Sequence, residues 1–312
     1  MINTNIKLFQ SASESYVPAI RLYTRRVRVS HSLPKISRWV NNWLYRFGIG
    51  MAINRYDNSF SLYSASADNN LYAKYSSGDR FINFGSGAFY HKRWKNYDYP
   101  GQSTYYKNLQ GRDGKSFHSI NLCAHDLAVH EDSESVALIY CSHTLEHLDR
   151  ASSVRFLNEC FRILKKGGVM RLALPNTKSG FSKIKCVNSQ QSVSENIKKN
   201  YFRDAATQII GAASKLDDKT LFELLIESDF DSESFYGIFV QRYQGSDDFD
   251  ENNSEKHINY WDVANLLVLT KEIGFKSVIP TYQNSSVAAP FTNPHVFDTT
   301  ESHISFYVDI IK

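Results

Sequence analysis

Short apolar runs alternate with a helical pattern from residue 81 onward, and this alternation constrains the fold more than any other feature of the chain. Residues 149–168 carry an apolar side chain every three or four positions, which is typical of an amphipathic helix. Strands alternating with helices predict a parallel, doubly wound α/β sheet with its ligand at the carboxyl ends of the strands. The predicted strands are 81–84, 96–99, 117–122, 136–141 and 169–175.

Capping residues mark where these elements begin and end. Asp149 or Ser152 can cap the start of the 149–168 helix, and Lys165, Lys166 and Gly167 suit its end. Two further strands complete a seven-stranded, mostly parallel, Rossmann-like sheet. The segments involved are a helix from 260 that stops at Gly274, a strand up to 280, and a last strand within 303–312.

Two segments lie outside this alternation. Residues 1–79 form an N-terminal extension, for which we predict a helix over 37–51 and a hairpin that turns at Asp68, Asn69 and Asn70. Residues 177–257 are polar and form a predicted helical insert that caps the ligand pocket. Its helices are expected at about 191–213 and 217–228, which leaves 80–176 and 258–312 as the sheet domain.

Charge is distributed unevenly along the chain, although the net charge is only +4. From Ser15 to Tyr56 there is no acidic residue, whereas eight residues are basic: Arg21, Arg25, Arg26, Arg28, Lys35, Arg38, Arg46 and Arg55. This stretch is either a solvated basic face or a surface for an anionic partner such as a phospholipid headgroup, a phosphorylated lipid carrier or an acidic glycan. Nucleic acid is not expected as a partner, because no nucleic-acid-binding motif accompanies the charge.

The remaining bulk properties indicate a cytoplasmic globular protein. No run of eighteen apolar residues exists, and the first residues lack the apolar region of a signal peptide. The four cysteines (Cys123, Cys141, Cys160 and Cys186) contain no CxxC pair, so neither a disulfide framework nor a zinc knuckle is indicated.

The stretch "FINFGSG" places two glycines directly after a predicted strand. Gly85 and Gly87 let the backbone turn tightly and approach a ligand with no Cβ in the way, although a plain turn has the same pattern. A dinucleotide fingerprint needs a third glycine at the position of Tyr90, and no GKS or GKT sequence is present. NAD and ATP are therefore disfavoured as ligands.

Two carboxylates follow the next two predicted strands. Asp98 ends the second strand, where a carboxylate can accept two hydrogen bonds from ribose hydroxyls. Asp126 follows the third strand, in a position suited to the exocyclic amine of an adenine. Either residue can also be an ordinary surface carboxylate.

Five stretches in order now define a resemblance: "FINFGSG", "DYP", "INLCAHDLAVHEDSESVALIYCSHTLEHL", "FLNECFRILKKGGVMRLALPN" and "GFKSV" with "ISFYVDII". Together they resemble a class I S-adenosylmethionine-dependent methyltransferase, of the type 11-like branch with HxxEH and LKxGG motifs. The resemblance covers 80–176 well and 258–312 in part. It implies S-adenosyl-L-methionine as the cofactor. No metal-binding residues are assigned from the sequence, which leaves open whether a metal assists acceptor binding.

The resemblance also implies roles for individual residues. Asn83, Gly85, Ser86 and Gly87 correspond to the loop that holds the methionine part of the cofactor, Asp98 to the ribose ligand, and Asp126 with Leu127 to the adenine contact. Two positions depart from the family pattern, because Asn83 replaces an acidic residue and Phe89 replaces the third glycine. The aminopropyl group is then expected to be held by backbone and by residues near Cys141 and Ser142.

The stretch "HTLEH" (143–147) has two interpretations. His-x-x-Glu-His is the inverted zinc-protease motif, but that chemistry needs both histidines on one helical face, whereas here the stretch directly follows a predicted strand. In a methyltransferase, His143 would lie at the mouth of the sheet and act as general base, with His147 as the second candidate. Glu146 would orient one histidine or cap the following helix.

The predicted function is O-methylation of a sugar hydroxyl in a bacterial surface polysaccharide or glycan, because proteins resembling this branch often serve such pathways. The stretch 15–56 would suit an anionic acceptor, or contact with a membrane or lipid carrier. Two alternatives stay open: methylation of a small metabolite or natural product on oxygen or nitrogen, and a non-catalytic interaction module with the methyltransferase fold.

Overall fold

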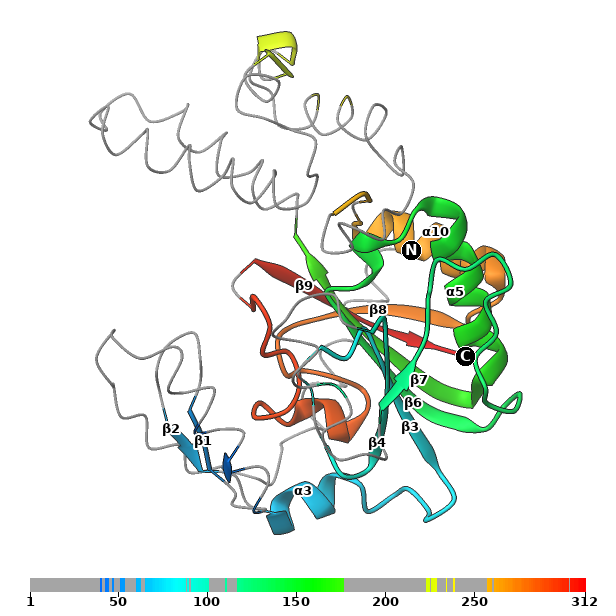
Figure 1. The fold of residues 1–312 in the computed structure, drawn as a ribbon. Helices are drawn as coiled ribbons and strands as arrows, with labels where there is room; N and C mark the ends of the chain where they lie inside the picture. Colours follow the sequence, from blue (N-terminus) through cyan, green and yellow to red (C-terminus); the bar gives the residue numbers. More distant parts are fainter. Residues whose placement is uncertain are drawn as a thin grey trace, which may run out of the picture. The chain divides into compact units, whose positions relative to one another are not determined.

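The computed structural model describes two compact units of the chain (Figure 1), Met1–Lys74 and Tyr75–Lys312. The described residues are 65–87, 89, 91–100, 117–176, 257–259, 261–302 and 304–312, the strand segments 51–53 and 60–62, and a few positions in 40–47, at 110 and in 223–238.

In the first unit, a short strand pair precedes a helix. Strand β1 (Met51–Ile53) pairs antiparallel with β2 (Phe60–Leu62), and helix α3 spans Ala65–Leu71. The predicted hairpin turn at 68–70 is therefore wrong, because these residues lie inside α3. Asp68 lies in the first turn of α3, where a negative charge is favourable.

The predicted helix over 37–51 lies largely outside the described residues. Val40, Trp43 and Leu44 are helical, whereas Met51 belongs to β1, so the helix ends before that residue. The rings of Trp43 and Phe47 lie 4.5 Å apart, as expected for side chains spaced four residues along a helix. Trp39, Gly48 and the basic residues from Arg21 to Arg38 lie outside the described residues.

The second unit is built on a seven-stranded sheet in the order β5-β4-β3-β6-β7-β9-β8. All neighbouring strands from β5 to β7 are parallel, and β9 is antiparallel to both of its neighbours. This order confirms the predicted fold class of a Rossmann-like, mostly parallel sheet. The strands are β3 (Arg80–Phe84), β4 (Trp94–Asp98), β5 (Phe117–Ser119), β6 (Val136–Ser142), β7 (Leu164–Pro175), β8 (Ser277–Thr281) and β9 (Ser305–Ile311).

Helix α5 (Arg150–Ile163) begins where the sequence predicts and ends earlier. Asp149 is its N-cap, since the side chain accepts a hydrogen bond from the Ser152 amide. Leu164 is already extended and pairs with Val136 of β6, so the predicted end at Lys165–Gly167 is wrong. Strand pairing there overrides the lysine and glycine signals for a helix end.

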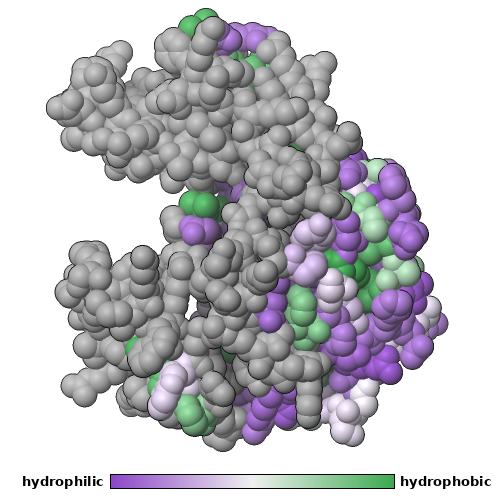
Figure 2. Space-filling model, in the orientation of Figure 1, coloured by the Kyte–Doolittle hydropathy of each residue, from purple (hydrophilic) through white to green (hydrophobic). Residues whose placement is uncertain are grey.

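Helix α10 (Val263–Ile273) ends as predicted. Gly274 adopts a left-handed conformation with φ of 111°, and its amide donates to the carbonyls of Thr270 and Lys271. Leu267 and Val268 of this helix are 48% and 55% exposed. Hydrophobic residues also lie among hydrophilic ones on the side of the unit where α5 and α10 are found (Figure 2).

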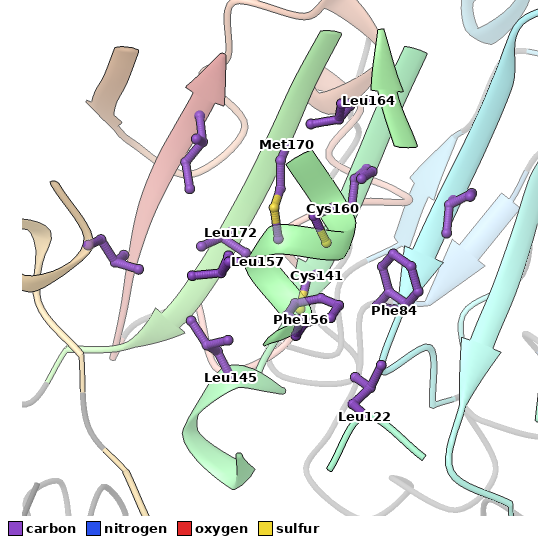
Figure 3. Packing of buried hydrophobic residues seen from close by; sticks show 14 of the residues in the cluster. Phe84, Leu122, Cys141, Leu145, Phe156, Leu157, Cys160, Leu164, Met170 and Leu172 are labelled. Atoms are coloured by element: carbon purple, nitrogen blue, oxygen red, sulfur yellow. The ribbon is translucent and has the colours of Figure 1, made fainter. Parts of the chain in front are cut away.

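The main core lies between the sheet and these two helices. Side chains from β3, β6 and β7 point toward α5 and pack against its buried face (Figure 3). The labelled members are Phe84, Leu122, Cys141, Leu145, Phe156, Leu157, Cys160, Leu164, Met170 and Leu172. Burial of this apolar surface supplies the main driving force for the fold.

Aromatic side chains cover the opposite face of the sheet. Trp94 of β4 and Tyr140 of β6 pack against Phe291 of the 3-10 helix η3 (Ala289–Thr292) and against Phe297 in the loop that follows it. Phe89, which takes the place of the expected third glycine, joins this cluster with its ring 5.6 Å from that of Phe297. Phe89 is therefore a packing residue of this face.

The 177–257 insert lies mostly outside the described residues, including its predicted first helix at 191–213. Positions 223–224 and 226–227 are helical, within the predicted second helix. In the part of the chain that the structure describes, no helix is long and apolar enough to cross a membrane.

Candidate active site

The carboxyl ends of β3 and β6 meet at the centre of the sheet. These strands are neighbours, yet the chain continues from β3 toward β4 on one side and from β6 toward β7 on the other. Phe84 pairs with Cys141, so Gly85 and the residues after Cys141 leave the sheet side by side. In open α/β sheets this reversal point is where ligands bind, which makes it the candidate site.

The glycine turn after β3 uses the conformations that favour glycine. Gly85 and Gly87 have φ values of 63° and 51°, and the Gly85 amide donates to the Tyr97 carbonyl at 2.9 Å. A Cβ on Gly85 would lie 2.7 Å from the Cβ of Thr144 and overlap its hydroxyl. The close approach that requires glycine at 85 is thus an approach to Thr144, a contact that the sequence did not indicate.

Asp98 fastens the glycine turn to the end of β4. The carboxylate is buried, with 3% of the residue exposed, and accepts hydrogen bonds from the Gly87 amide at 2.6 Å and the Tyr99 amide at 2.8 Å. A carboxylate has roughly four acceptor positions. The structure places Asp98 against the glycine turn, as a shared ligand site requires.

Asn83 and Ser86 are both buried at the same edge. The Asn83 side chain donates to Asn96 Oδ1 over 3.5 Å, and its own Oδ1 has no hydrogen bond among the described residues. The Ser86 carbonyl accepts from the Phe89 amide at 2.8 Å, which closes the turn.

The remaining predicted cofactor residues differ in exposure. Asp126 is exposed in the loop after β5, and Leu127 is partly buried against the core. Cys141 belongs to the core beneath α5, where burial raises the pKa of its thiol, so its side chain is not at the site. Ser142 is partly buried at the end of β6.

His143 occupies the turn after β6, as predicted. Its φ is 50°, an uncommon value for a residue with a side chain, and its amide donates to the Ala173 carbonyl at 2.8 Å. The ring Nδ1 lies 3.3 Å from Glu146 Oε1, and Nε2 lies 2.8 Å from Ser305 Oγ. Imidazole is thus held between a carboxylate and a hydroxyl.

Glu146 lies in the short 3-10 helix η1 (Leu145–His147), where only 1% of the residue is exposed. Burial alone would raise the pKa of this carboxyl, but the neighbouring imidazoles, His143 foremost, outweigh burial and lower the pKa to about 2. Glu146 does not cap α5, because Asp149 does. The prediction of a cap is therefore wrong, and the contact with His143 matches the alternative of an orienting carboxylate.

The arrangement of "HTLEH" also disagrees with the inverted zinc-protease motif. His143 lies in the turn and His147 at the end of η1, so the two histidines are not presented by one α-helical face. The structural condition for that chemistry is not met.

The segment that returns from the insert is hydrogen-bonded to η1. The amides of Ile258 and Asn259 donate to the Glu146 carbonyl at 2.9 and 3.0 Å, and Trp261 Nε1 donates to the Leu145 carbonyl at 3.1 Å. This docking brings His257 to His147, with ring centroids 4.7 Å apart. Burial lowers the pKa of His257 to about 4.

Sequence reasoning missed two residues of this site, His257 and Ser305. Each lies more than a hundred positions from the "HTLEH" stretch, and no spacing or motif links them to it. An indirect signal could have found Ser305. The last strand is antiparallel to its neighbours, so its first residue, Ser305, lies at the edge where the parallel strands end.

Comparison with known protein families gives a match to part of the chain. Residues 97–172 match the family model described as "Methyltransferase domain". None of the curated proteins compared with the chain matches it.

Solved structures of methyltransferases are similar over most of the chain at low identity. The CurJ carbon methyltransferase is 8% identical with a TM-score of 0.37, over 77% of this chain and 50% of its own. The phosphoethanolamine N-methyltransferase 2 of Haemonchus contortus, in complex with S-adenosylhomocysteine, is 7% identical with a TM-score of 0.35, over 80% and 53%. A SAM-dependent methyltransferase of Archaeoglobus fulgidus is 10% identical with a TM-score of 0.37, over 88% and 94%.

This chain thus spans about half the length of the first two proteins. Residues 97–172 thus match a methyltransferase domain, and the strand order is that of a Rossmann-like sheet; S-adenosylmethionine is the methyl donor that the resemblance of the sequence implies. The residues present fit that cofactor, because a buried carboxylate and a turn of positive-φ glycines meet at the reversal point of the sheet.

Proposed function

We propose that this protein is an S-adenosylmethionine-dependent methyltransferase that methylates a hydroxyl group of a sugar, in a bacterial surface polysaccharide or related glycan. The observation that carries the proposal is the pairing of His143 with Glu146 at the carboxyl edge of the sheet, next to the glycine turn. A hydroxyl must lose its proton when it is methylated, and imidazole is the side chain best suited to accept it near neutral pH.

The cofactor would be held by the edge formed by β3, β4 and the loop after β5. Asp98 would accept hydrogen bonds from the ribose hydroxyls alongside the two amides it already accepts. Asp126 and Leu127 would contact the adenine, while the buried Asn83, the glycine turn and the backbone at Cys141 and Ser142 would hold the methionine part. When bound, S-adenosylmethionine supplies a methyl group on a positively charged sulfonium.

In the proposed mechanism, the acceptor hydroxyl binds where Nε2 of His143 can reach it. Nε2 would take the proton of this hydroxyl as the oxygen receives the methyl group, and the demethylated cofactor would then leave. Glu146 holds the ring from the Nδ1 side and stabilises the imidazolium that forms. Alignment of the acceptor with the methyl group supplies much of the remaining rate enhancement.

The acid-free stretch from Ser15 to Tyr56 supports an anionic acceptor, or one carried on an anionic lipid. Its eight basic residues would attract such a molecule over roughly a Debye length, about 8–10 Å. We therefore expect acidic sugars to be better methyl acceptors than neutral sugars.

The test is a methyl-transfer assay with a set of acceptors. The full chain is incubated with S-adenosylmethionine and with uronic-acid glycans, neutral glycans, catechols and small amines, and the methylated product is located by mass spectrometry. Methylation of a sugar oxygen, fastest for acidic glycans, is expected. Transfer only to a catechol or an amine would overturn the sugar assignment, and absence of transfer with intact cofactor binding would favour an interaction module.

A further inference from the structure

Glu146, His147 and His257 come together from two segments far apart in the sequence. One potential ligand atom from each residue lies within 4.8 Å of the corresponding atoms of the other two. Glu146 and His147 belong to η1, and His257 precedes the segment that docks on that helix. No motif or spacing in the sequence connects His257 with this stretch.

The position of His257 is fixed by backbone hydrogen bonds. The two residues that follow it, Ile258 and Asn259, both donate to the Glu146 carbonyl, and the Asn259 side chain donates to the Leu148 carbonyl at 3.2 Å. His257 is therefore held against η1 before any ligand binds. A site assembled in this way loses little conformational freedom on binding.

The Glu146 carboxylate is buried and faces imidazole groups. Within the part of the chain that the structure describes, neither of its oxygens accepts a well-formed hydrogen bond. Its nearest basic groups are imidazoles, His143 Nδ1 at 3.3 Å and His257 Nε2 at 4.0 Å. A buried carboxylate is stabilised by partners that carry positive charge, and a bound metal ion would add one beside these imidazoles.

We propose that Glu146, His147 and His257 bind a divalent transition-metal ion, with Zn²⁺ as the best fit. Two imidazole nitrogens and one carboxylate oxygen are a common ligand set for Zn²⁺, whereas Mg²⁺ and Ca²⁺ prefer oxygen ligands. Ligand atoms around tetrahedral zinc lie about 3.4 Å apart, so the three side chains need to close in by small rotations. No metal ligands were assigned from the sequence, and this site goes beyond the proposed function.

Such an ion would join the end of the insert to the turn that carries the proposed base. Glu146 would bridge the metal and His143, because one carboxylate oxygen faces both His143 and His257. Binding would therefore stabilise the docked state of residues 257–261. This effect does not depend on the identity of the methyl acceptor.

Binding can be measured with Co²⁺ as a coloured substitute for Zn²⁺. The reduced full-length protein is treated with a chelator, dialysed and titrated with cobalt chloride, and the visible absorption is recorded. Wild-type protein is expected to bind one equivalent, which ZnCl₂ displaces. His257→Ala and Glu146→Gln are expected to weaken binding at least about 100-fold, since each removes one of three ligands.

The matched control is His130→Ala, because His130 is exposed and lies outside this cluster. It should bind Co²⁺ like wild type. Zn²⁺ should also raise the unfolding temperature of wild type and of this control, and leave that of His257→Ala unchanged. Absence of Co²⁺ binding by wild type, or wild-type binding by His257→Ala, would overturn the proposal. If Glu146→Gln does not fold, the His257→Ala and His147→Ala variants decide the question.

Discussion

The Nε2 atom of His143 lies 2.8 Å from the hydroxyl oxygen of Ser305. Ser305 begins β9, and because β9 is antiparallel to β7, its first residue lies at the edge where β6 ends. The serine hydroxyl can donate one hydrogen bond, either to Nε2 or to the Glu301 carbonyl oxygen, which also lies 2.8 Å from Ser305 Oγ. Ser305 Oγ therefore marks a position from which a hydroxyl can reach Nε2.

Replacing His143 tests the proposed base. His143→Ala should lower the turnover number by about 10²–10⁴, because proton removal from the acceptor loses its catalyst. The dissociation constant of S-adenosylhomocysteine should stay within a few-fold of wild type. Turnover is measured by product formation and binding by calorimetry, with His130→Ala as the control of unchanged activity. Full turnover in His143→Ala would exclude the residue as the base.

The strands and helices of the sheet domain were predictable because each has its own local pattern. Apolar runs of four to seven residues, the cap at Asp149 and the stop at Gly274 are local signals that agree with the final packing. The glycine turn and Asp98 were predictable for the same reason, since each directly follows a strand.

The errors arise where distant contacts decide the structure. Leu164 is extended because it pairs with Val136 of β6, a strand that precedes it in the sequence. Gly85 is constrained by Thr144, and His143 contacts Ser305, although neither partner is near in sequence. These pairs can be found only after the sheet order is known.

The carboxylate of Asp98 should control cofactor affinity. Asp98→Asn removes the negative charge and replaces one carboxylate oxygen with an NH₂ group. That oxygen accepts a hydrogen bond from the Gly87 or the Tyr99 amide, and an NH₂ group cannot accept it, so both the turn and the ribose contact are disturbed. Loss of charged hydrogen bonds predicts a roughly 10- to 100-fold weaker affinity for S-adenosylhomocysteine. Calorimetric titration measures this affinity, and Asp132→Asn, at a side chain that is 84% exposed, is the control. Equal affinities in both variants would remove Asp98 from the cofactor site.

The contact between Gly85 and Thr144 predicts a steric coupling. Gly85→Ala adds a Cβ that overlaps Thr144 and also forces an alanine to adopt φ of 63°, so the free energy of unfolding should fall by roughly 1–3 kcal/mol or more. In a Thr144→Gly background the steric part disappears and only the backbone strain is left. A double-mutant cycle in urea measures this coupling. Additive effects of the two substitutions would show that Thr144 does not restrict residue 85.

Arg171 forms a buried ion cluster that no sequence pattern indicated. Its guanidinium, on β7, contacts Asp298 at 2.6 Å and Asp309 at 2.8 Å, with all three side chains buried. Asp298→Asn leaves a buried cation with less compensation, and the free energy of unfolding should fall by about 3–5 kcal/mol. The exposed pair of Arg80 and Asp132 provides the comparison, where Asp132→Asn should change stability by about 0–1 kcal/mol. Urea unfolding of the three proteins measures both differences, and similar losses in the two variants would contradict the argument.

Glu131 should make stability depend on acid pH. Its side chain is buried and accepts hydrogen bonds from Lys95, Arg80 and the Tyr97 hydroxyl. Burial acts to raise the pKa of this carboxyl, but those three donors outweigh burial and hold the pKa below its ordinary value of 4.5. Because the folded-state pKa is the lower one, the stabilisation is present above pH 4.5 and is lost as the pH falls through the folded-state pKa.

Glu131→Gln isolates this effect from that of other carboxyl groups. At pH 7 the variant should be less stable than wild type by roughly 1–3 kcal/mol, at the lower end because Arg80 and Lys95 are 41% and 43% exposed. The difference should shrink as the pH is lowered below 4.5, since wild-type Glu131 then becomes protonated and resembles the amide. Urea unfolding of both proteins between pH 7 and pH 3 measures it. A difference that stays constant over this range would mean that the charge of Glu131 does not contribute to stability.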